Sequence, residues 1–107
     1  MQHDPYQPVF RALADPTRRA ILSMLADGER PIADIAAEFE MTRPAIAKHL
    51  AILKEGDLIS VEAQGRERIN RLNPAALKTA ADWLSYFDQF WDVRLGKLKE
   101  MVEQKDV

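Results

Sequence analysis

The side chains with the clearest chemical potential lie in one stretch, Thr42–Ile59. Its apolar residues recur at helical spacing, which marks one buried helix face; they are Ile46, Leu50 and Leu53. The opposite face carries cationic or small residues, namely Arg43, Ala47, Lys48 and His49. Small residues let a helix approach a surface closely, and flanking cations suit a groove lined by phosphates. The pattern is typical of a DNA recognition helix.

Local signals define the ends of this helix. Thr42 is placed to act as its N-cap, Pro44 is tolerated in its first turn, and Gly56 is placed to stop it. The residues predicted to touch DNA here are Thr42, Arg43, Pro44, Ala45, Ala47, Lys48 and His49. Arg43, Lys48 and His49 could instead form a solvated face, and His49 could point inward and hydrogen-bond within the domain.

A β-hairpin is predicted directly after Gly56. Two short runs with period-2 alternation flank a turn that contains Gly65, and Arg66 and Arg68 lie at or just after its tip. Such a hairpin is the wing of a winged helix-turn-helix, suited to contact the phosphate backbone or an adjacent minor groove. Residues 42–71 contain six Lys or Arg and four acids, whereas the rest of the chain is net acidic.

The preceding residues predict the elements that hold the recognition helix. A short helix is expected over 9–14, and Asp15 with Pro16 predicts the N-cap and first position of a second helix that ends near Asp27. Pro31 should open a third helix, followed by a tight turn, which completes a helix-turn-helix. Arg18, at the start of the second helix, is either a phosphate contact or a surface residue.

A last helix is expected from Pro74 to about Val102, capped by Asn73. At 1.5 Å per residue it would be roughly 45 Å long, longer than one side of so small a domain. The domain's own core cannot cover the whole apolar stripe of this helix, so the stripe needs a second covering surface, and another copy of the chain is the simplest source of one. The interface residues predicted on this helix are Leu84, Phe87, Trp91 and Leu98. The aromatic residues could also line a pocket for an apolar inducer, although core and dimer contacts are favoured.

Composition sets limits on the remaining possibilities. The 107 residues suffice for one domain, predicted over 8–107 after a flexible lead-in of residues 1–7. Fifteen Lys plus Arg against seventeen Asp plus Glu give a net charge of −2, so DNA binding must rest on a local basic patch. The N-terminus does not resemble a signal peptide and no apolar run is long enough to span a membrane, so a soluble cytoplasmic protein is expected.

Neither a metal site nor catalysis is predicted. The sequence has no cysteine, and its two histidines, His3 and His49, are far apart without a paired spacing. No nucleophile-and-base pair, Gly-rich phosphate loop or carboxylate pair stands out. No cofactor is therefore expected, and the fold class is mainly α (α+β), with about five helices and a two-stranded wing.

Three motifs resemble the ArsR-type winged-helix regulators. Residues 13–22 (LADPTRRAIL) resemble the opening of that family, residues 42–59 its recognition helix and exit, and residues 65–73 (GRERINRLN) its wing. The resemblance covers roughly residues 8 to 104. The Trp-rich final helix resembles a branch of the family that lacks metal sites.

The resemblance implies a homodimeric bacterial repressor, paired through its first and last helices, that occludes a promoter. Phe10 of the first helix is accordingly expected at the dimer interface. Members of the family typically release DNA when an inducer, often a metal ion, binds. Where the family's thiolate site would lie, this chain has residues 32–37 (IADIAA) without cysteine, and its last helix has carboxylates but no histidine.

The resulting hypothesis is a sequence-specific, dimeric repressor of a palindromic operator that does not sense metals through thiolates. Its partners are double-stranded DNA, a second copy of the chain and an unidentified small-molecule inducer, with no membrane. The alternative is a protein-interaction winged-helix module without DNA binding, supported by the acidic balance and the Trp-rich stripe. That alternative leaves four cations unexplained: Arg43, Lys48, Arg66 and Arg68.

Overall fold

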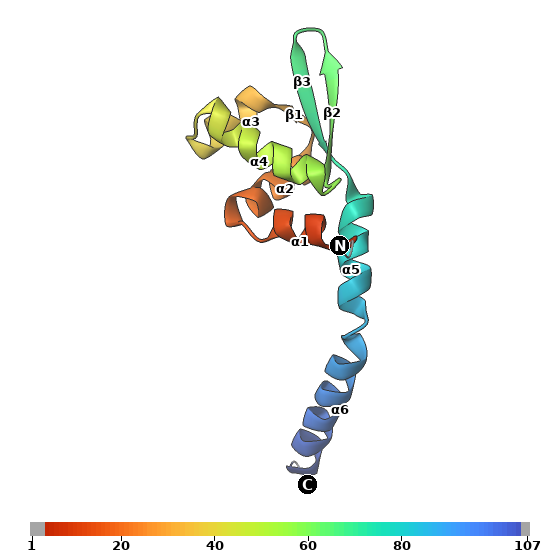
Figure 1. Ribbon diagram of the computed structural model, residues 1–107. Helices are drawn as coiled ribbons and strands as arrows, with labels where there is room; N and C mark the ends of the chain where they lie inside the picture. Colours follow the sequence, from red (N-terminus) through yellow and green to blue (C-terminus); the bar gives the residue numbers. More distant parts are fainter. Residues whose placement is uncertain (1–3, 106–107) are drawn as a thin grey trace.

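The computed structural model describes residues 4–105, with the side chains of 92–94 and 104–105 left out. Its helices and strands form a small body from which the C-terminal helices extend (Figure 1). In chain order the elements are α1 (Gln7–Leu13), α2 (Pro16–Asp27), β1 (Arg30–Pro31), α3 (Ile32–Phe39), α4 (Arg43–Glu55), β2 (Ile59–Gln64), β3 (Glu67–Leu72), α5 (Pro74–Ser85) and α6 (Asp88–Lys105).

The core lies where the apolar stripes of α1 to α5 meet the base of the sheet. Its largest fully buried side chains are Ile21, Ile35, Ile46, Leu53 and Leu58. Full burial of such a side chain contributes about 1.5–3 kcal/mol relative to exposure. The predicted stripe of α4 is therefore confirmed as a buried face, and it packs with the buried faces of α2 and α3.

The helix-turn-helix is formed by α3 and α4. The backbone of Glu40 ends α3 in the left-handed region at φ 53°, and its N–H donates to the carbonyl oxygens of Ala36 and Ala37. Thr42 then caps α4, because its side chain accepts a hydrogen bond from the N–H of Ala45. The predicted tight turn and N-cap are both confirmed.

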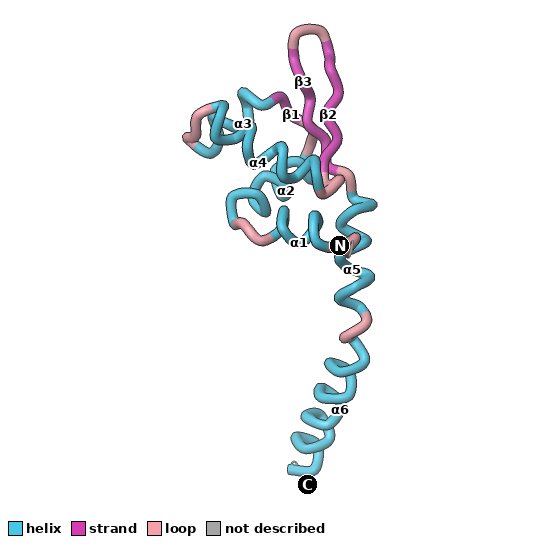
Figure 2. Tube along the Cα trace, viewed as in Figure 1, coloured by secondary structure: helices cyan, strands magenta, loops and turns pink. Residues whose placement is uncertain are grey.

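The wing is a hairpin of β2 and β3 with a two-residue turn (Figure 2). Gln64 pairs with Glu67, and Gly65 between them has φ +62°, a conformation that an L side chain rarely adopts. The predicted hairpin is confirmed. Its third strand was not predicted: Arg30–Pro31 pairs antiparallel with β3, which gives the sheet order β1-β3-β2.

The single helix predicted over 74–102 is wrong, because the chain forms α5 and α6 with a turn between them. At the turn the N–H of Tyr86 donates to the carbonyl of Trp83, and that of Phe87 to Leu84, so the helical ladder tightens to three-residue spacing. Aromatic residues lose side-chain freedom in a helix, and here their rings contact one another across the turn.

The helix α6 projects from the body and, within the described residues, packs mainly against α5 (Figure 1). The radius of gyration is 19.1 Å, against about 13 Å for a compact domain of this length. None of the described helices is both long and apolar enough to cross a membrane. This extended end supplies most of the unpaired apolar surface.

The N-terminal lead-in expected over residues 1–7 ends before Gln7 in the structure, because α1 begins at that residue. Residues 1–3 lie outside the described part of the chain. Asp4 begins a turn in which its carboxylate accepts the N–H of Tyr6, and Gln7 already belongs to α1. The first helix therefore begins two residues before the expected Val9.

Candidate nucleic-acid interface

The outward face of α4 carries the predicted base-contacting side chains. Ile46, Leu50 and Leu53 are buried under the helix. The residues exposed on its outer side are Arg43, Pro44, Ala47, Lys48, Ala51, Lys54 and Glu55, of which Glu55 forms an ion pair with Arg11 of α1. Thr42 is also exposed and Ala45 is half-buried. A helix with small side chains along the middle of its outer face and cations beside them can enter a major groove.

The wing presents its arginines in two different ways. Arg68 is exposed and faces Ala63 across the hairpin, on the same side as Asn70 and Val61. Arg66 lies in the exposed turn at the tip. Arg71 lies on the opposite side of the hairpin, because neighbouring residues of a strand alternate between its faces.

Arg71 is engaged at the base of the wing. Its guanidinium forms ion pairs with Glu29, which precedes β1, and with Glu62 of β2, where Nη1 lies 2.6 Å from Oε2. The hydrogen bond and the negative charge of Glu29, together with the charge of Glu62, raise the pKa of Arg71. This arginine ties the wing to the segment after α2, and sequence reasoning gave it no such role.

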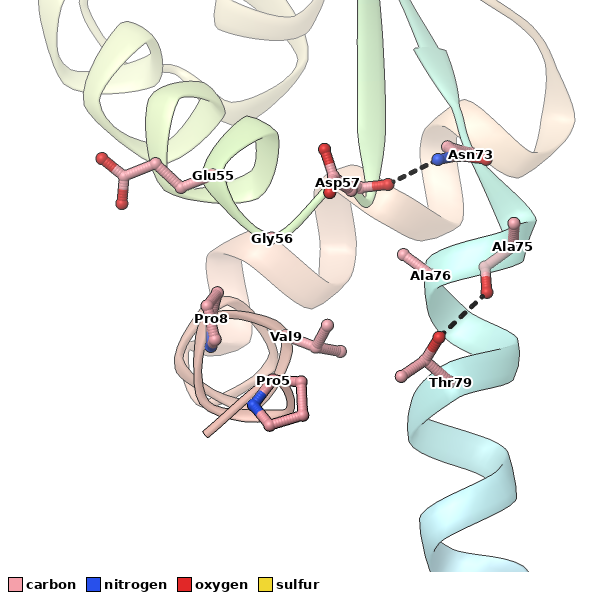
Figure 3. A pocket seen from close by; sticks show the side chains of 10 residues that line it. All are labelled: Pro5, Pro8, Val9, Glu55, Gly56, Asp57, Asn73, Ala75, Ala76 and Thr79. Atoms are coloured by element: carbon pink, nitrogen blue, oxygen red, sulfur yellow. Dashed lines mark hydrogen bonds between the residues drawn. The ribbon is translucent and has the colours of Figure 1, made fainter. Parts of the chain in front are cut away.

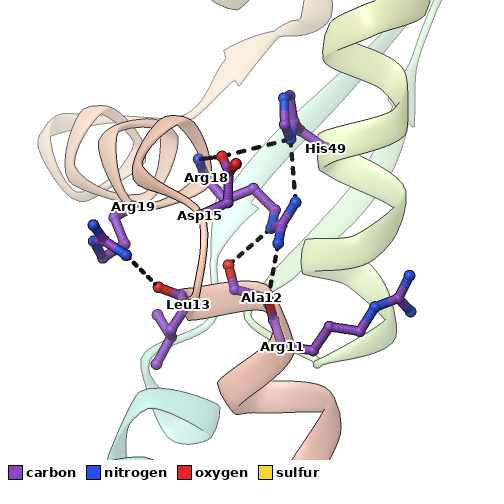
Figure 4. Close-up of polar contacts among 7 residues, drawn as sticks. All are labelled: Arg11, Ala12, Leu13, Asp15, Arg18, Arg19 and His49. Carbon is purple, nitrogen blue, oxygen red and sulfur yellow. Dashed lines mark hydrogen bonds and ion pairs between the residues drawn. The ribbon is translucent and has the colours of Figure 1, made fainter.

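Arg18 is directed into the protein (Figure 4). Its Nε donates to the carbonyl of Ala12 at 2.9 Å and its Nη2 to that of Arg11 at 2.9 Å, which satisfies carbonyls at the end of α1. Its Nη1 lies 3.4 Å from Nδ1 of His49 on α4. One side chain thus joins α1, α2 and α4.

His49 faces the same cluster, which agrees with the inward alternative considered from the sequence. Its Nδ1 lies 3.9 Å from Oδ2 of Asp15, and its side chain is only 21% exposed. Asp15 is the N-cap of α2 and accepts the N–H of Arg18 at 3.0 Å. That hydrogen bond is the main reason why the pKa of Asp15 lies below its usual 3.8, and the charges of Arg18 and His49 act in the same direction.

A shallow pocket of about 350 Å³ opens where α1, the end of α4 and the start of α5 meet (Figure 3). Gly56 allows the close approach there, because a Cβ at this position would lie 2.9 Å from the carbonyl oxygen of Pro8. The amide of Asn73 donates to the carbonyl of Asp57 at 2.7 Å, so it links the two chain segments. Asn73 occupies the predicted N-cap position of α5 but makes no side-chain capping bond.

The predicted dimer residues border a continuous aromatic surface. The ring of Phe10 contacts Trp83 edge-on at 5.4 Å between centroids, and Trp83 contacts Phe87 at 5.0 Å. Further along α5 and α6, Leu84 is 54% exposed and Trp91 64%. Leu98, in the middle of α6, is 57% exposed. Large apolar side chains this exposed mark an interaction surface.

A helix-turn-helix followed directly by a hairpin wing defines the class of winged helix-turn-helix DNA-binding regulators. Residues 15–61 match the family described as bacterial regulatory protein, arsR family, and the transcriptional repressor SdpR of Bacillus subtilis is 39% identical over 79 residues. That alignment covers 74% of this chain and 88% of the Bacillus protein. The chain belongs to the ArsR family, whose members are transcription regulators and not enzymes.

Solved structures show the same fold. An ArsR-like transcriptional regulator from Rhodococcus is 34% identical and superposes with a TM-score of 0.76, over 94% of this chain and 92% of that one. A homodimeric winged helix-turn-helix DNA-binding domain from Mycobacterium bovis is 27% identical with a TM-score of 0.66, over 83% of this chain and 90% of that one.

Proposed function

We propose that the protein is a homodimeric repressor that recognises a palindromic operator in double-stranded DNA. The observation that carries the proposal is the outer face of α4, where small residues and cations lie beside a wing with two exposed arginines, Arg66 and Arg68. Repression is the activity named for the related SdpR protein. In this proposal α4 enters the major groove and the wing rests on the phosphate backbone.

The side chains have separate roles in this proposal. Thr42, Arg43 and Lys48 read or flank base edges, while Pro44, Ala45 and Ala47 allow close approach of the helix. Arg66 and Arg68 hold the wing against the backbone. Arg18 and His49 are better placed to orient α4 from behind, because Arg18 donates to α1 and the His49 side chain is mostly covered.

Dimerisation would proceed through the aromatic surface of α1, α5 and α6. The exposed residues Leu84, Phe87, Trp91 and Leu98 need a covering partner, and the related Mycobacterium bovis domain is described as homodimeric. A two-fold dimer presents two recognition helices, which matches a palindromic site. Phe10 supports the surface through its edge contact with Trp83.

Release from DNA would not use thiolate ligation of a metal ion. The 107 residues contain no cysteine, which is the residue that supplies thiolate ligands. The inducer that we propose for this protein is a small molecule and not a metal ion held by thiolates. The proposed cellular location of this regulator is the cytoplasm.

The direct test is fluorescence anisotropy of the purified protein with a labelled duplex from upstream of its own gene. A scrambled duplex of the same composition serves as the control, and both are titrated at low and near-physiological salt. Preferential binding of the upstream duplex that persists at the higher salt is expected. Phosphate contacts alone would give equal and salt-sensitive binding to both duplexes.

Two outcomes would contradict the proposal. A folded dimer that binds neither duplex at either salt would favour the protein-interaction module. A protein that remains monomeric at micromolar concentration would remove the basis for a palindromic operator.

A further inference from the structure

A groove separates the recognition helix from the wing. It has a volume of about 270 Å³. The residues that line it come from α3, α4, β2 and β3: Ile32, Ala47, Leu50, Ala51, Lys54, Val61, Arg68 and Asn70. Its walls are mainly apolar, and the two small side chains Ala47 and Ala51 leave space along α4. None of the predictions from sequence placed Ala51 or Lys54 in a binding site.

Two cations border this groove from opposite walls. Lys54 belongs to the last turn of α4, and Arg68 lies on β3. Both are exposed, and neither has a carboxylate within ion-pair distance among the residues that the structure describes. The nearby Arg71 is different, because Glu29 and Glu62 already neutralise it on the other side of the hairpin. The groove therefore has uncompensated positive charge on both walls.

Asn70 completes the floor of the groove and is itself satisfied. Its amide donates to the carbonyl of Arg30 on β1, and its side chain is buried. Val61 faces it across the hairpin and covers the neighbouring part of the floor. The floor is fixed by the sheet, so an occupant meets a preformed surface.

We propose that this groove seats one sugar–phosphate strand of the operator, with sugars on Ala47, Ala51 and Val61 and phosphates between Lys54 and Arg68. The inference rests on the proposed DNA-binding function and deepens it. When a helix occupies the major groove and a wing faces the adjacent minor groove, the strand that separates these grooves must pass between the two elements. The groove has the position and the charge that this strand requires.

This assignment favours DNA over a protein or a second copy of the chain. A strand of DNA carries one phosphate per 3.4 Å, so a groove with a cation on each of two walls is complementary to it. A protein segment would need carboxylates to match them. The exposed surface suited to a second copy lies instead on α5 and α6, which carry the large apolar side chains.

The test measures binding of the upstream and scrambled duplexes by the full-length dimer and two groove variants. Lys54→Gln removes one cation, and Ala51→Leu fills the groove at an exposed helical position where leucine is a good helix former. Two controls make the same chemical changes elsewhere: Lys78→Gln on α5 and Ala26→Leu on α2, both exposed. Circular dichroism and thermal unfolding establish that all four variants fold.

The proposal predicts about tenfold weaker binding of both duplexes for Lys54→Gln and for Ala51→Leu, and unchanged binding for the controls. The slope of log K against log salt should fall by about 1.8 for Lys54→Gln, because the dimer loses one phosphate contact of about 0.9 from each protomer. A neutral methylphosphonate placed at the contacted phosphate should weaken the wild type more than it weakens Lys54→Gln, which retains only Arg68 at this site.

Other results overturn the proposal, and they can be told apart. If the wild type binds DNA and both groove variants bind as well as their controls, the groove holds no strand while the DNA-binding function stands. If Lys54→Gln weakens binding but Ala51→Leu does not, Lys54 contacts a phosphate outside the groove, and the proposal that the DNA strand lies in the groove is wrong. If the wild type binds neither duplex, the underlying function itself fails.

Discussion

The guanidinium of Arg18 lies beside the imidazole of His49, with 3.4 Å between Nη1 and Nδ1, and also donates to the carbonyls of Arg11 and Ala12. The recognition helix is thereby connected to α1, which carries Phe10 of the proposed dimer surface. An arginine that looks from the sequence like a phosphate contact thus has the geometry of a residue that positions α4. The two roles predict different salt behaviour.

Arg18→Gln should lower the free energy of unfolding by about 1–2 kcal/mol, because carbonyls at the end of α1 lose their donors. DNA affinity should also fall, but the slope of log K against log salt should stay at the wild-type value, since no phosphate contact is lost. Arg19→Gln is the matched control, because the exposed Arg19 side chain donates to one carbonyl of α1, that of Leu13, whereas Arg18 donates to two and also lies beside His49. Its loss of stability should therefore be smaller. A slope reduced by about 1.8 in Arg18→Gln, or about 0.9 for each protomer, would show a phosphate contact instead.

Asp15 should make stability sensitive to acid. The pKa of Asp15 in the folded state lies below the usual 3.8. The ionised carboxylate therefore stabilises the fold fully above that value, and this stabilisation is lost as the pH falls through the lower pKa of the folded state. Asp15→Asn keeps a capping side chain but removes this titration. The melting temperature of the variant should therefore depend less on pH than that of the wild type below about pH 4.

The corresponding control is Asp27→Asn, which removes a carboxylate at the other end of α2. Thermal unfolding of the three proteins between about pH 2 and 6 provides the comparison. If the melting temperatures of Asp15→Asn and the wild type depended equally on pH, the charge of the N-cap would contribute nothing to stability.

Gly56 should tolerate no side chain, for reasons of space. A Cβ there would lie 2.9 Å from the backbone oxygen of Pro8, which cannot move without shifting α1. Gly56→Ala should therefore destabilise the fold by about 1–3 kcal/mol in chemical denaturation. Gly28→Ala provides the control, because nothing lies within 4 Å of its added Cβ. Similar losses for both variants would show that the contact with Pro8 is relieved at no cost.

The sequence predicted the parts of the fold that local chemistry determines. The N-caps Asp15 and Thr42 and the apolar stripe of α4 lie where the pattern placed them. The hairpin turn at Gly65 is also as predicted. Each of these features depends on residues within one or two turns of each other, so the linear pattern contains the information.

The features that the sequence did not predict depend on contacts between distant residues. Strand β1 consists of Arg30–Pro31 and exists only because it pairs with Asn70 and Ile69. The inward position of Arg18 depends on α1 ending beside it, which helical periodicity does not report. The turn at Tyr86–Phe87 interrupts a stripe whose spacing suits a continuous helix. The ion pair of Arg71 with Glu29 joins residues 42 positions apart in the chain, so no local pattern predicts it.

Arg43 and Arg68 should differ in their effect on specificity. Arg43 begins the exposed face of α4, so Arg43→Ala should reduce the preference for the upstream duplex over the scrambled one, by about 1–3 kcal/mol at the contacted position. Arg68→Ala on the wing should weaken both duplexes about equally and reduce the salt slope by about 1.8, or about 0.9 for each protomer. Anisotropy titrations at several salt concentrations measure both effects. Loss of affinity without any change in preference for both variants would refute this division of roles.

The aromatic surface should control assembly. Trp91 is 64% exposed on α6 and is one of the residues proposed to be covered by a second copy. Trp91→Glu would place a charge in that interface, where its desolvation is costly, so the dimer should dissociate at least tenfold more readily.

Gln89→Glu adds the same charge two residues away on α6 and is the matched control. Its amide already donates to the carbonyl of Tyr86, so it belongs to the local turn. Sedimentation equilibrium measures the dissociation constants of the three proteins. Weaker dimerisation by Trp91→Glu should also lower affinity for a palindromic duplex much more than for a single half-site, because only the palindrome gains from two linked recognition helices. An unchanged dissociation constant for Trp91→Glu would place the dimer interface elsewhere on the protein.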